Sequence, residues 1–343
     1  MITPRHSAPP AALLMPAFCV VLCAGLCAAV QPTLWGLTIV HPSPTEVALA
    51  SVDPMTGNVT VAGPALPELF GMSDLVAVAN GLLFYLGDSH EGATLVGVSL
   101  GNGSRVCSAH VNVAEVQYVG VGQTLDFDPA SNTLVLSGVT SDGSSHAVYR
   151  ADATTCGGFK KVGTFGDAKY LPMLHASALD ARGRRLYVDL ATGANTPALG
   201  VVDLTGAKPL QVFAEEATPD AHDLLVGMHF DAATGHLVGV LGGGGAPLSL
   251  HTFDTRSQTW AADRLISGVP ANWNTEGGNS GVVSTLDSGS RTLFFIAGRE
   301  FQLNKTRVEV DYYLAAVDID SAALHADPPR LSAGLKLLAL KAS

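Results

Sequence analysis

The sequence predicts an all-β protein: a six-bladed β-propeller of four-stranded antiparallel blades, with a ring that the N- and C-terminal strands close. Two observations lead to this prediction. A hairpin motif occurs four times. A second motif, at the end of a third strand, occurs six times, and four of these six copies follow one of the hairpins. Both landmarks recur at intervals near fifty residues, the length of one propeller blade.

The hairpin motif is an Asp that stands six residues before an apolar Leu. The residues between them are turn formers ("PASNT", "ARGRR", "AATGH", "SGSRT"), and the flanking segments are rich in β-formers, as in "TLVLSG" and "RLYVDL". This pattern is typical of two antiparallel strands joined by a tight turn. The Asp residues are separated by 52, 51 and 56 positions, and they are Asp128, Asp180, Asp231 and Asp287.

The second landmark ends a third strand and is followed by a turn and a short fourth strand, such as "NVTVAG" or "LQVFA". Its steps are 47, 52, 51, 51 and 64 residues, and its six members predict six blades. We interpret the recurring Asp residues as turn residues whose carboxylates accept backbone N–H groups, rather than as a calcium-binding series. The members are Asp53, Leu100, Asp152, Asp203, Asp254 and Asp318.

A four-stranded sheet cannot bury both of its faces alone, and radial packing against copies of itself does so. The first blade has only three strands before the second begins at "DLVAVANGLLFYLG", so we expect "GLKLLALKAS", residues 334–343, to supply the fourth. A surface helix is the alternative for this tail, since its apolar residues also match helical spacing. The alternative fold is a pair of β-sandwich domains, which explains the strands but not the regular step.

The "LDxxxxxLYV … VVDLTG" rhythm resembles the NHL, YVTN and gluconolactonase-like six-bladed propellers. The resemblance covers nearly all of the chain after residue 29 and is one of architecture, because WD40 and kelch signatures are absent. It implies that ligands bind where the axis meets one face of the ring. It also implies that a divalent metal is held there by a Glu, an Asn and an Asp.

Residues 1–29 are predicted to be a signal peptide, which leaves residues 30–343 as a single propeller domain. "MITPRHSAPP" carries one Arg, and the following "AALLMPAFCVVLCAGLCAAV" is apolar and uncharged. Cys27 and Ala29 place small residues at positions −3 and −1 of a cleavage site. The alternative is a retained transmembrane anchor, because the apolar run is long enough to span a bilayer. We expect cleavage and therefore a secreted, extracellular protein.

Secretion agrees with three glycosylation sequons, at Asn58, Asn102 and Asn304. Cys107 and Cys156 are the two cysteines that remain after cleavage. An oxidising compartment favours their pairing. Their predicted positions near the outermost strands of successive blades favour separation, so we expect no bridge.

The chain is acidic, with a formal charge of −11 and no Lys/Arg cluster. This charge disfavours nucleic acid and anionic membranes as partners. We expect a monomer whose ligand is a protein or a carbohydrate. The sequence contains no Gly-x-Ser-x-Gly, His-Glu-x-x-His or Gly-x-x-x-x-Gly-Lys motif.

Candidate metal ligands follow from the resemblance together with the polar residues that precede the innermost strands. Carboxylate and amide oxygens suit Ca²⁺ or another divalent ion. The alternative is that these are solvated loop residues. The four candidates, which would converge on the axis from different blades, are Asp74, Asp126, Glu276 and Asn279.

A second set of candidates lies on the expected axial face: His175, His222, Asp223 and His229. Two His from adjacent blades with an Asp would suit zinc or another transition metal, and the alternative is that each His is a solvated or hydrogen-bonded structural residue. Trp273 stands in the polar segment "NWNTEGGNSG". If exposed, it would stack on a sugar or on a partner's side chain; alternatively it packs against a blade edge.

These observations predict a secreted binding or interaction module whose ligand is unknown. The alternative function is a divalent-metal-dependent, lactonase-like hydrolase with its site on the propeller axis and a metal-bound water as nucleophile. A third alternative is a structural protein of the cell surface or matrix. Convergent carboxylates and a tightly held metal would distinguish the hydrolase from the other two.

Overall fold

The computed structural model describes the chain between residues 32 and 342, and residues 32–343 form one compact unit. The described ranges are 32–42, 45–66, 76–89, 92–111, 124–139, 145–165, 170–192, 197–205, 211–214, 226–241, 247–270, 273–275, 283–304, 307–331 and 337–342. Within these ranges the regular elements are β-strands, and no helix is long and apolar enough to cross a membrane.

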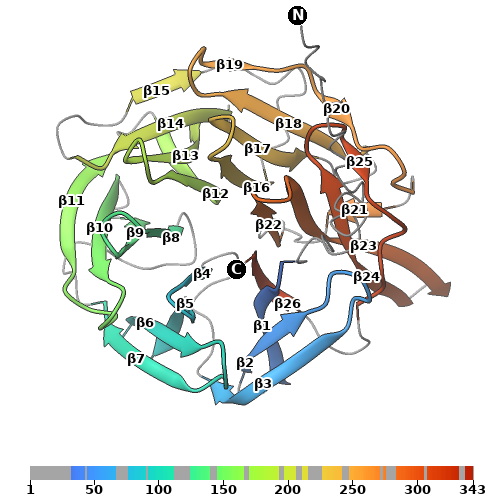
Figure 1. Ribbon diagram of the computed structural model, residues 1–343, viewed down its shortest axis with the longest axis horizontal. Coiled ribbons are helices and arrows are strands. Elements are labelled where there is room, and N and C mark those ends of the chain that lie inside the picture. Colours follow the sequence, from blue (N-terminus) through green and yellow to red (C-terminus); the bar gives the residue numbers. More distant parts are fainter. Residues whose placement is uncertain are drawn as a thin grey trace, which may run out of the picture. The chain divides into compact units, whose positions relative to one another are not determined.

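Six antiparallel sheets surround a common axis (Figure 1). From the axis outward, blade 1 contains β26 (Leu337–Ala342), β1 (Leu34–Pro42), β2 (Thr45–Val52) and β3 (Val59–Leu66). Blade 2 contains β4 (Val76–Ala79), β5 (Leu82–Ser89), β6 (Gly92–Ser99) and β7 (Arg105–His110). Blade 3 contains β8 (Thr124–Asp128), β9 (Thr133–Val139), β10 (His146–Asp152) and β11 (Lys160–Phe165).

The remaining blades follow the same order, with extra strands in two of them. Blade 4 contains β12 (Tyr170–Asp180), β13 (Arg185–Thr192), β14 (Pro197–Asp203) and β15 (Gln211–Ala214). Blade 5 contains β16 (Val226–Asp231), β17 (His236–Leu241), β18 (Ser249–Asp254), β19 (Thr259–Trp260) and β20 (Arg264–Leu265), the last paired with β18. Blade 6 contains β21 (Trp273–Thr275), β22 (Ser284–Asp287), β23 (Thr292–Asn304), β24 (Arg307–Asp318) and β25 (Ala323–Leu324), with β21 and β22 both paired to β23.

The predicted all-β, six-bladed propeller is confirmed, and so is its closure. The C-terminal strand β26 pairs antiparallel with β1, from Leu34 opposite Ala342 to Thr38 opposite Leu337. A surface helix at the tail and a pair of sandwich domains are therefore both wrong. Closure by the two ends of the chain makes the ring continuous and gives the first blade its innermost strand.

The recurring Asp residues close turns, as the repeat predicted. In the β8–β9 hairpin, Asp128 Oδ1 accepts the Ala130 N–H at 3.0 Å and its Oδ2 accepts the Ser131 hydroxyl at 2.7 Å. In the β16–β17 hairpin, Asp231 Oδ1 accepts the Ala233 N–H at 3.1 Å. The same bond to the N–H two residues on, or three in the case of Asp180, recurs at Asp53, Asp152, Asp180, Asp203, Asp254, Asp287 and Asp318.

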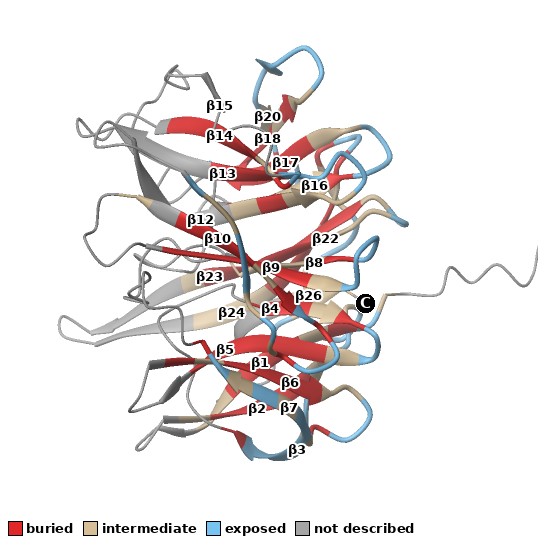
Figure 2. Cartoon of the chain, turned by 90° about the vertical axis from the view of Figure 1, so that its left-hand side faces the viewer, coloured by how far each residue is buried: buried red, intermediate tan, exposed pale blue. Residues whose placement is uncertain are grey.

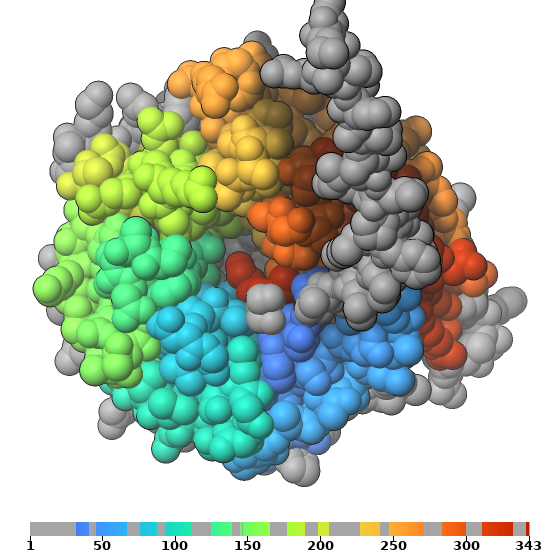
Figure 3. Space-filling model, in the orientation of Figure 1, coloured from blue at the N-terminus to red at the C-terminus, as the bar shows by residue number. Residues whose placement is uncertain are grey.

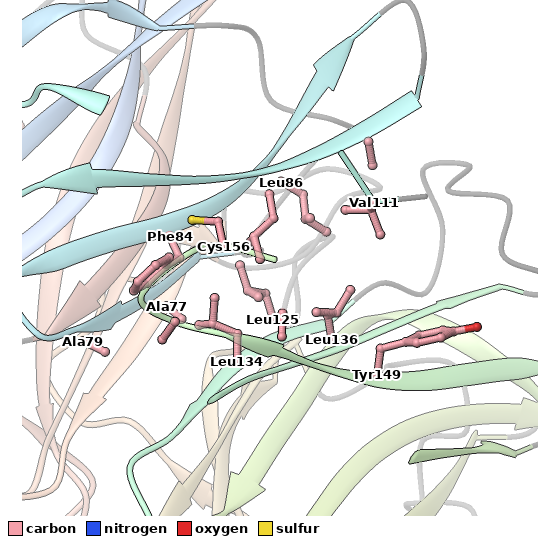
Figure 4. Close-up of a cluster of buried hydrophobic side chains, with 14 of the residues drawn as sticks. Ala77, Ala79, Phe84, Leu86, Val111, Leu125, Leu134, Leu136, Tyr149 and Cys156 are labelled. Carbon is pink, nitrogen blue, oxygen red and sulfur yellow. The ribbon is translucent and has the colours of Figure 1, made fainter. Parts of the chain in front are cut away.

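The hydrophobic core is divided among the junctions between blades. Each of the six junctions in the described part of the chain has its own cluster of buried side chains, and the junction of blades 6 and 1 closes the circle. Figure 4 shows the junction of blades 2 and 3, where Phe84 and Leu86 face Leu125 and Leu134. Figure 2 shows buried residues along the strands and exposed residues in the turns at one end of the ring.

A disulfide joins Cys107 to Cys156, with their Cα atoms 5.7 Å apart, so the expected separation of these residues is wrong. Cys107 lies in β7 of blade 2, but Cys156 lies in the turn between β10 and β11 of blade 3, at a φ of 59°. That turn brings its sulfur against the neighbouring blade. A Cβ on Gly97 would lie 2.7 Å from Cys107 Sγ and 3.1 Å from Cys156 Sγ, so glycine makes room for the bridge.

Candidate functional site

The innermost strands of the six blades, β26, β4, β8, β12, β16 and β22, form a closed circle in which each strand contacts the next. Residues that are distant in the sequence therefore meet at the axis. Figure 1 places the C-terminus near the middle of the ring, and Figure 3 shows a recess there, with atoms of the C-terminal strand at its rim. Polar side chains from five of these strands form the candidate site.

Asp126 of β8 and Ser177 of β12 join blades 3 and 4. The Ser177 hydroxyl donates to Asp126 Oδ2 at 3.0 Å, and both residues keep part of their surface exposed. Asp126 stands two residues before the turn Asp of its blade, and Ser177 stands three before the turn Asp of the next. Because alternate residues of a strand point to opposite faces, this offset directs the two side chains toward each other.

His229 of β16 and Ser284 of β22 repeat the same arrangement between blades 5 and 6. His229 is two residues before Asp231, Ser284 is three before Asp287, and His229 Nε2 lies 2.8 Å from Ser284 Oγ. The blade repeat thus places two cross-blade pairs around the axis, one with a carboxyl and one with an imidazole.

Lys341 of β26 supplies the cation of the site. Its charge lowers the pKa of both Asp126 and His229. The position of β26 is fixed on both sides. It pairs with β1, and the backbone N–H of Ala342 donates to Thr285 Oγ1 of β22 at 3.0 Å.

The axial environment shifts the pKa values of the two titrating partners of Lys341. Burial raises the pKa of Asp126, while the charge of Lys341 and the hydrogen bond from Ser177 oppose that rise. Burial and, to a smaller extent, the charge of Lys341 together lower the pKa of His229 from 6.5 to about 3. His229 is consequently neutral at pH 7, with one ring nitrogen as donor and the other as acceptor.

Two of the axial residues, Asp126 and His229, were predicted from the sequence. Ser177, Ser284 and Lys341 were not. The two serines were detectable in principle, because aligning the blades on the turn Asp places them at the same position of alternate blades. Predicting Lys341 as a site residue would have required the register of β26 against β1, which the sequence of a single apolar strand does not reveal.

Several predicted residues lie outside the described part of the chain or are only partly described. His175 falls in β12 and Asn304 ends β23, but nothing is described of their side chains. Asn58 and Asn102 lie exposed in the turns between the third and fourth strands of blades 1 and 2, which leaves the glycosylation prediction open. The candidates outside the described residues are Asp74, His222, Asp223, Glu276 and Asn279.

Trp273 is not the exposed aromatic that the sequence suggested. It is 5 % exposed in β21, which pairs with β23, and its ring stacks on Tyr313 with centroids 4.8 Å apart. The alternative interpretation, packing against a blade edge, describes its position. Trp273 therefore stabilises blade 6 and does not present a stacking surface.

The described residues contain no group of three or more His, Cys, Asp or Glu side chains that could hold a metal ion. Asp126 is the one predicted ligand within them, and it is engaged by Ser177 and by the charge of Lys341. These observations do not fit a metal centre built from the described residues. The metal site that includes Asp74, Glu276 and Asn279 stays a prediction.

Known proteins resemble the chain in fold and not in sequence. No protein-family model matches the chain, and no curated protein matches it either. Among solved structures, TolB from Acinetobacter baumannii is 10% identical with a TM-score of 0.51, over 90% of this chain and 66% of that one.

Two further solved structures are similar at lower TM-scores. An exo-β-1,3-galactanase from Phanerochaete chrysosporium is 14% identical with a TM-score of 0.46, over 80% of this chain and 66% of that one. A protein from Desulfotomaculum acetoxidans is 11% identical with a TM-score of 0.47, over 89% of each chain. The chain spans just under two thirds of the length of the galactanase and of TolB. At such identities the similarity shows the fold alone. That fold is a six-bladed β-propeller.

Proposed function

We propose that the protein is a binding module that holds an uncharged, hydroxyl-rich ligand, a carbohydrate, at the propeller axis. The observation that carries this proposal is that Asp126, His229 and Lys341, all partly exposed, lie on three strands of the inner circle and that the charge of Lys341 acts on both other groups. Each sugar hydroxyl both donates and accepts a hydrogen bond. It therefore suits a lining that mixes donors with acceptors.

The charges of the cluster support a neutral ligand over an ionic one. The Asp126 carboxylate and the Lys341 ammonium offset each other, and His229 is neutral at pH 7. Lys341 has three N–H donors, and Asp126 keeps acceptor capacity beyond the single bond from Ser177. The carboxylate of Asp126 would repel an anionic ligand, and the ammonium group of Lys341 would repel a cationic one.

The cluster is also held in place before any ligand arrives. The Asp126–Ser177 and His229–Ser284 pairs each connect two blades, and β26 is bonded to β1 and β22. Side chains fixed in this way lose little conformational freedom on binding, so a larger share of the contact energy appears as affinity.

The test is a panel of glucose, galactose, mannose, N-acetylglucosamine and their β-linked disaccharides, measured by saturation-transfer NMR and titration calorimetry. Lys341→Met removes the ammonium group but keeps the length of the side chain, and it is expected to weaken saccharide binding by about tenfold or more. Lys160→Met, an exposed position in β11, is the matched control. The proposal is contradicted if no saccharide binds or if both variants bind like the wild type.

We further propose that the protein acts outside the cell. Residues 1–29, the three sequons and the Cys107–Cys156 bridge support this location, since disulfides persist in oxidising compartments. Expression in a eukaryotic cell line tests it. We expect to find the protein in the medium, with an N-terminus near residue 30. Its apparent mass on a gel should decrease after glycosidase treatment. Full-length protein retained in the cell would contradict the proposal.

A further inference from the structure

We propose that Ser249, His251 and Asp263 of blade 5 form a nucleophilic triad that takes an acyl group from an ester. This site is separate from the axial cluster, because β18 is the third strand of its blade counted from the axis. The proposal does not depend on carbohydrate binding.

The strand register builds the arrangement. In the pairing of β18 with β20, Ser249 is opposite Leu265 and Leu250 is opposite Arg264. Continued by one residue, the same register places His251 opposite Asp263. Residues directly opposite each other in an antiparallel pair share a face of the sheet, and so do Ser249 and His251, two positions apart on one strand.

The contacts of His251, a hydrogen bond at one ring nitrogen and a close approach of a carboxylate at the other, run in the order that a triad requires. Ser249 Oγ lies 2.9 Å from His251 Nε2, and His251 Nδ1 lies 2.9 Å from Asp263 Oδ1. A carboxylate on Nδ1 holds the proton at that nitrogen and leaves the Nε2 lone pair directed at the hydroxyl. The two ring nitrogens thus have distinct partners: the nucleophile Ser249 at Nε2 and the orienting carboxylate of Asp263 at Nδ1.

The pairing with Asp263 is held by neighbouring contacts. The Ala261 N–H donates to Thr252 O and the Ile266 N–H to Leu248 O, each at 2.9 Å, on either side of the triad. Arg264 donates to the carbonyl oxygens of residues 319 and 320 in blade 6, both at 2.6 Å. These bonds fix the segment that carries the acid against two blades.

The burial of the three residues is graded. Ser249 is 8 % exposed and His251 is 1 % exposed, while the Asp263 side chain is 44 % exposed. Ser249 as a residue thus keeps a small exposed surface, and the imidazole that would receive its proton is shielded from solvent. Because water screens the carboxylate of Asp263, we assign it an orienting role and place the chemistry on the other two.

The reaction balances with the groups present and water. Ser249 Oγ attacks the ester carbonyl carbon as its proton passes to His251 Nε2, and the tetrahedral intermediate collapses when the alcohol leaves with that proton. Water then attacks the acyl-serine and gives its proton to His251. The carboxylic acid leaves, and the serine hydroxyl is restored.

A fluorophosphonate probe tests the nucleophile directly. Serine oxygen bonds to phosphorus, fluoride leaves, and the hydroxyl proton passes through His251 to solvent. On the full-length, folded protein we expect one phosphonate per chain, located on Ser249 by peptide mass spectrometry, and hydrolysis of p-nitrophenyl acetate above the buffer rate. Absence of labelling, or labelling at another serine such as Ser284, overturns the proposal.

Variants separate a nucleophilic triad from a structural hydrogen-bond network. Ser249→Ala should abolish labelling, whereas Ser137→Ala, at a fully buried serine of β9, should leave it unchanged. Asp263→Asn should slow labelling by about tenfold or more, and Asp263→Glu should restore part of the rate. If Asp263→Asn labels as fast as the wild type while its melting temperature falls, the network is structural and the proposal is wrong.

Discussion

The replacement of His229 by Gln gives a quantitative test of the axial environment. A glutamine keeps a polar group that can bond Ser284, but it does not titrate. In the folded protein the pKa of His229 is about 3, whereas the unfolded chain has the ordinary value of 6.5. Below pH 6.5 the unfolded state therefore takes up a proton that the folded state does not bind, and stability falls between pH 6.5 and about 3.

The size of the effect follows from linkage. At pH 5 the unfolded histidine is almost fully protonated and the folded one is neutral, so the wild type loses about 2 kcal/mol relative to pH 7 through this residue alone. His229→Gln lacks this loss. Asp126 acts in the opposite direction, because a carboxyl whose pKa is raised by burial favours the folded state as the pH falls toward that value. Asp126→Asn measures that contribution separately.

Urea unfolding followed by tryptophan fluorescence at pH 7 and pH 5 measures the difference. Turn carboxylates such as Asp53 and Asp318, whose pKa values are lowered by their hydrogen bonds, titrate below this interval and do not interfere. We expect the wild type to lose about 2 kcal/mol more than His229→Gln between the two pH values. Equal losses in the two proteins would refute the burial of a neutral imidazole at the axis.

Four further outcomes are expected. Replacing Cys107 and Cys156 by Ser should lower the free energy of unfolding by up to about 4 kcal/mol, since the bridge spans 49 residues; an unchanged urea midpoint would contradict it. Trp273→Ala should lower it by about 3–5 kcal/mol through lost burial, and a change below 1 kcal/mol would contradict the buried position. Arg291→Ala leaves the fully buried carboxylate of Asp231 without its 2.7 Å partner and should lower it by about 2 kcal/mol by the same assay, with no change as the opposing result. If the four predicted ligands hold a metal, elemental analysis finds one divalent ion per chain and a chelator lowers the melting temperature, whereas a metal-free protein with an unchanged melt contradicts that prediction.

The fold was predictable because the repeated residues form hydrogen bonds with neighbours in the sequence. Asp128 and its counterparts close each hairpin through their own backbone neighbours, so their spacing reports the blade length without tertiary information. The tail was assignable to a strand only because the first blade lacked one. Its exact pairing, Leu34 opposite Ala342, depends on contacts that no local pattern encodes.

The features that were missed depend on contacts between segments distant in sequence. The turn that carries Cys156 reaches toward blade 2, and its positive φ of 59° is not signalled by the residue type. Trp273 has polar neighbours in sequence, yet it packs on Tyr313 from another strand. The residues adjacent in sequence therefore did not predict burial, because burial depends on contacts with segments that are distant in sequence.

The same distinction applies to the candidate site. Asp126 and His229 were identifiable as polar residues of inner strands. The partners that give them their properties come from β12, β22 and β26. Ser249 and His251 drew no attention in the sequence, because Asp263 joins them only through the pairing of β20 with β18.

The most direct test of carbohydrate binding at the axis is NMR of the histidine side chains in protein labelled with ¹⁵N-histidine. His229 is one of 11 histidines and is assigned by the signal that disappears in His229→Gln. Titration with a saccharide that binds is expected to shift the His229 ring signals in proportion to occupancy, and Lys341→Met should weaken the response. Saturable binding that leaves His229 unshifted, or that shifts other histidines instead, would contradict an axial carbohydrate site.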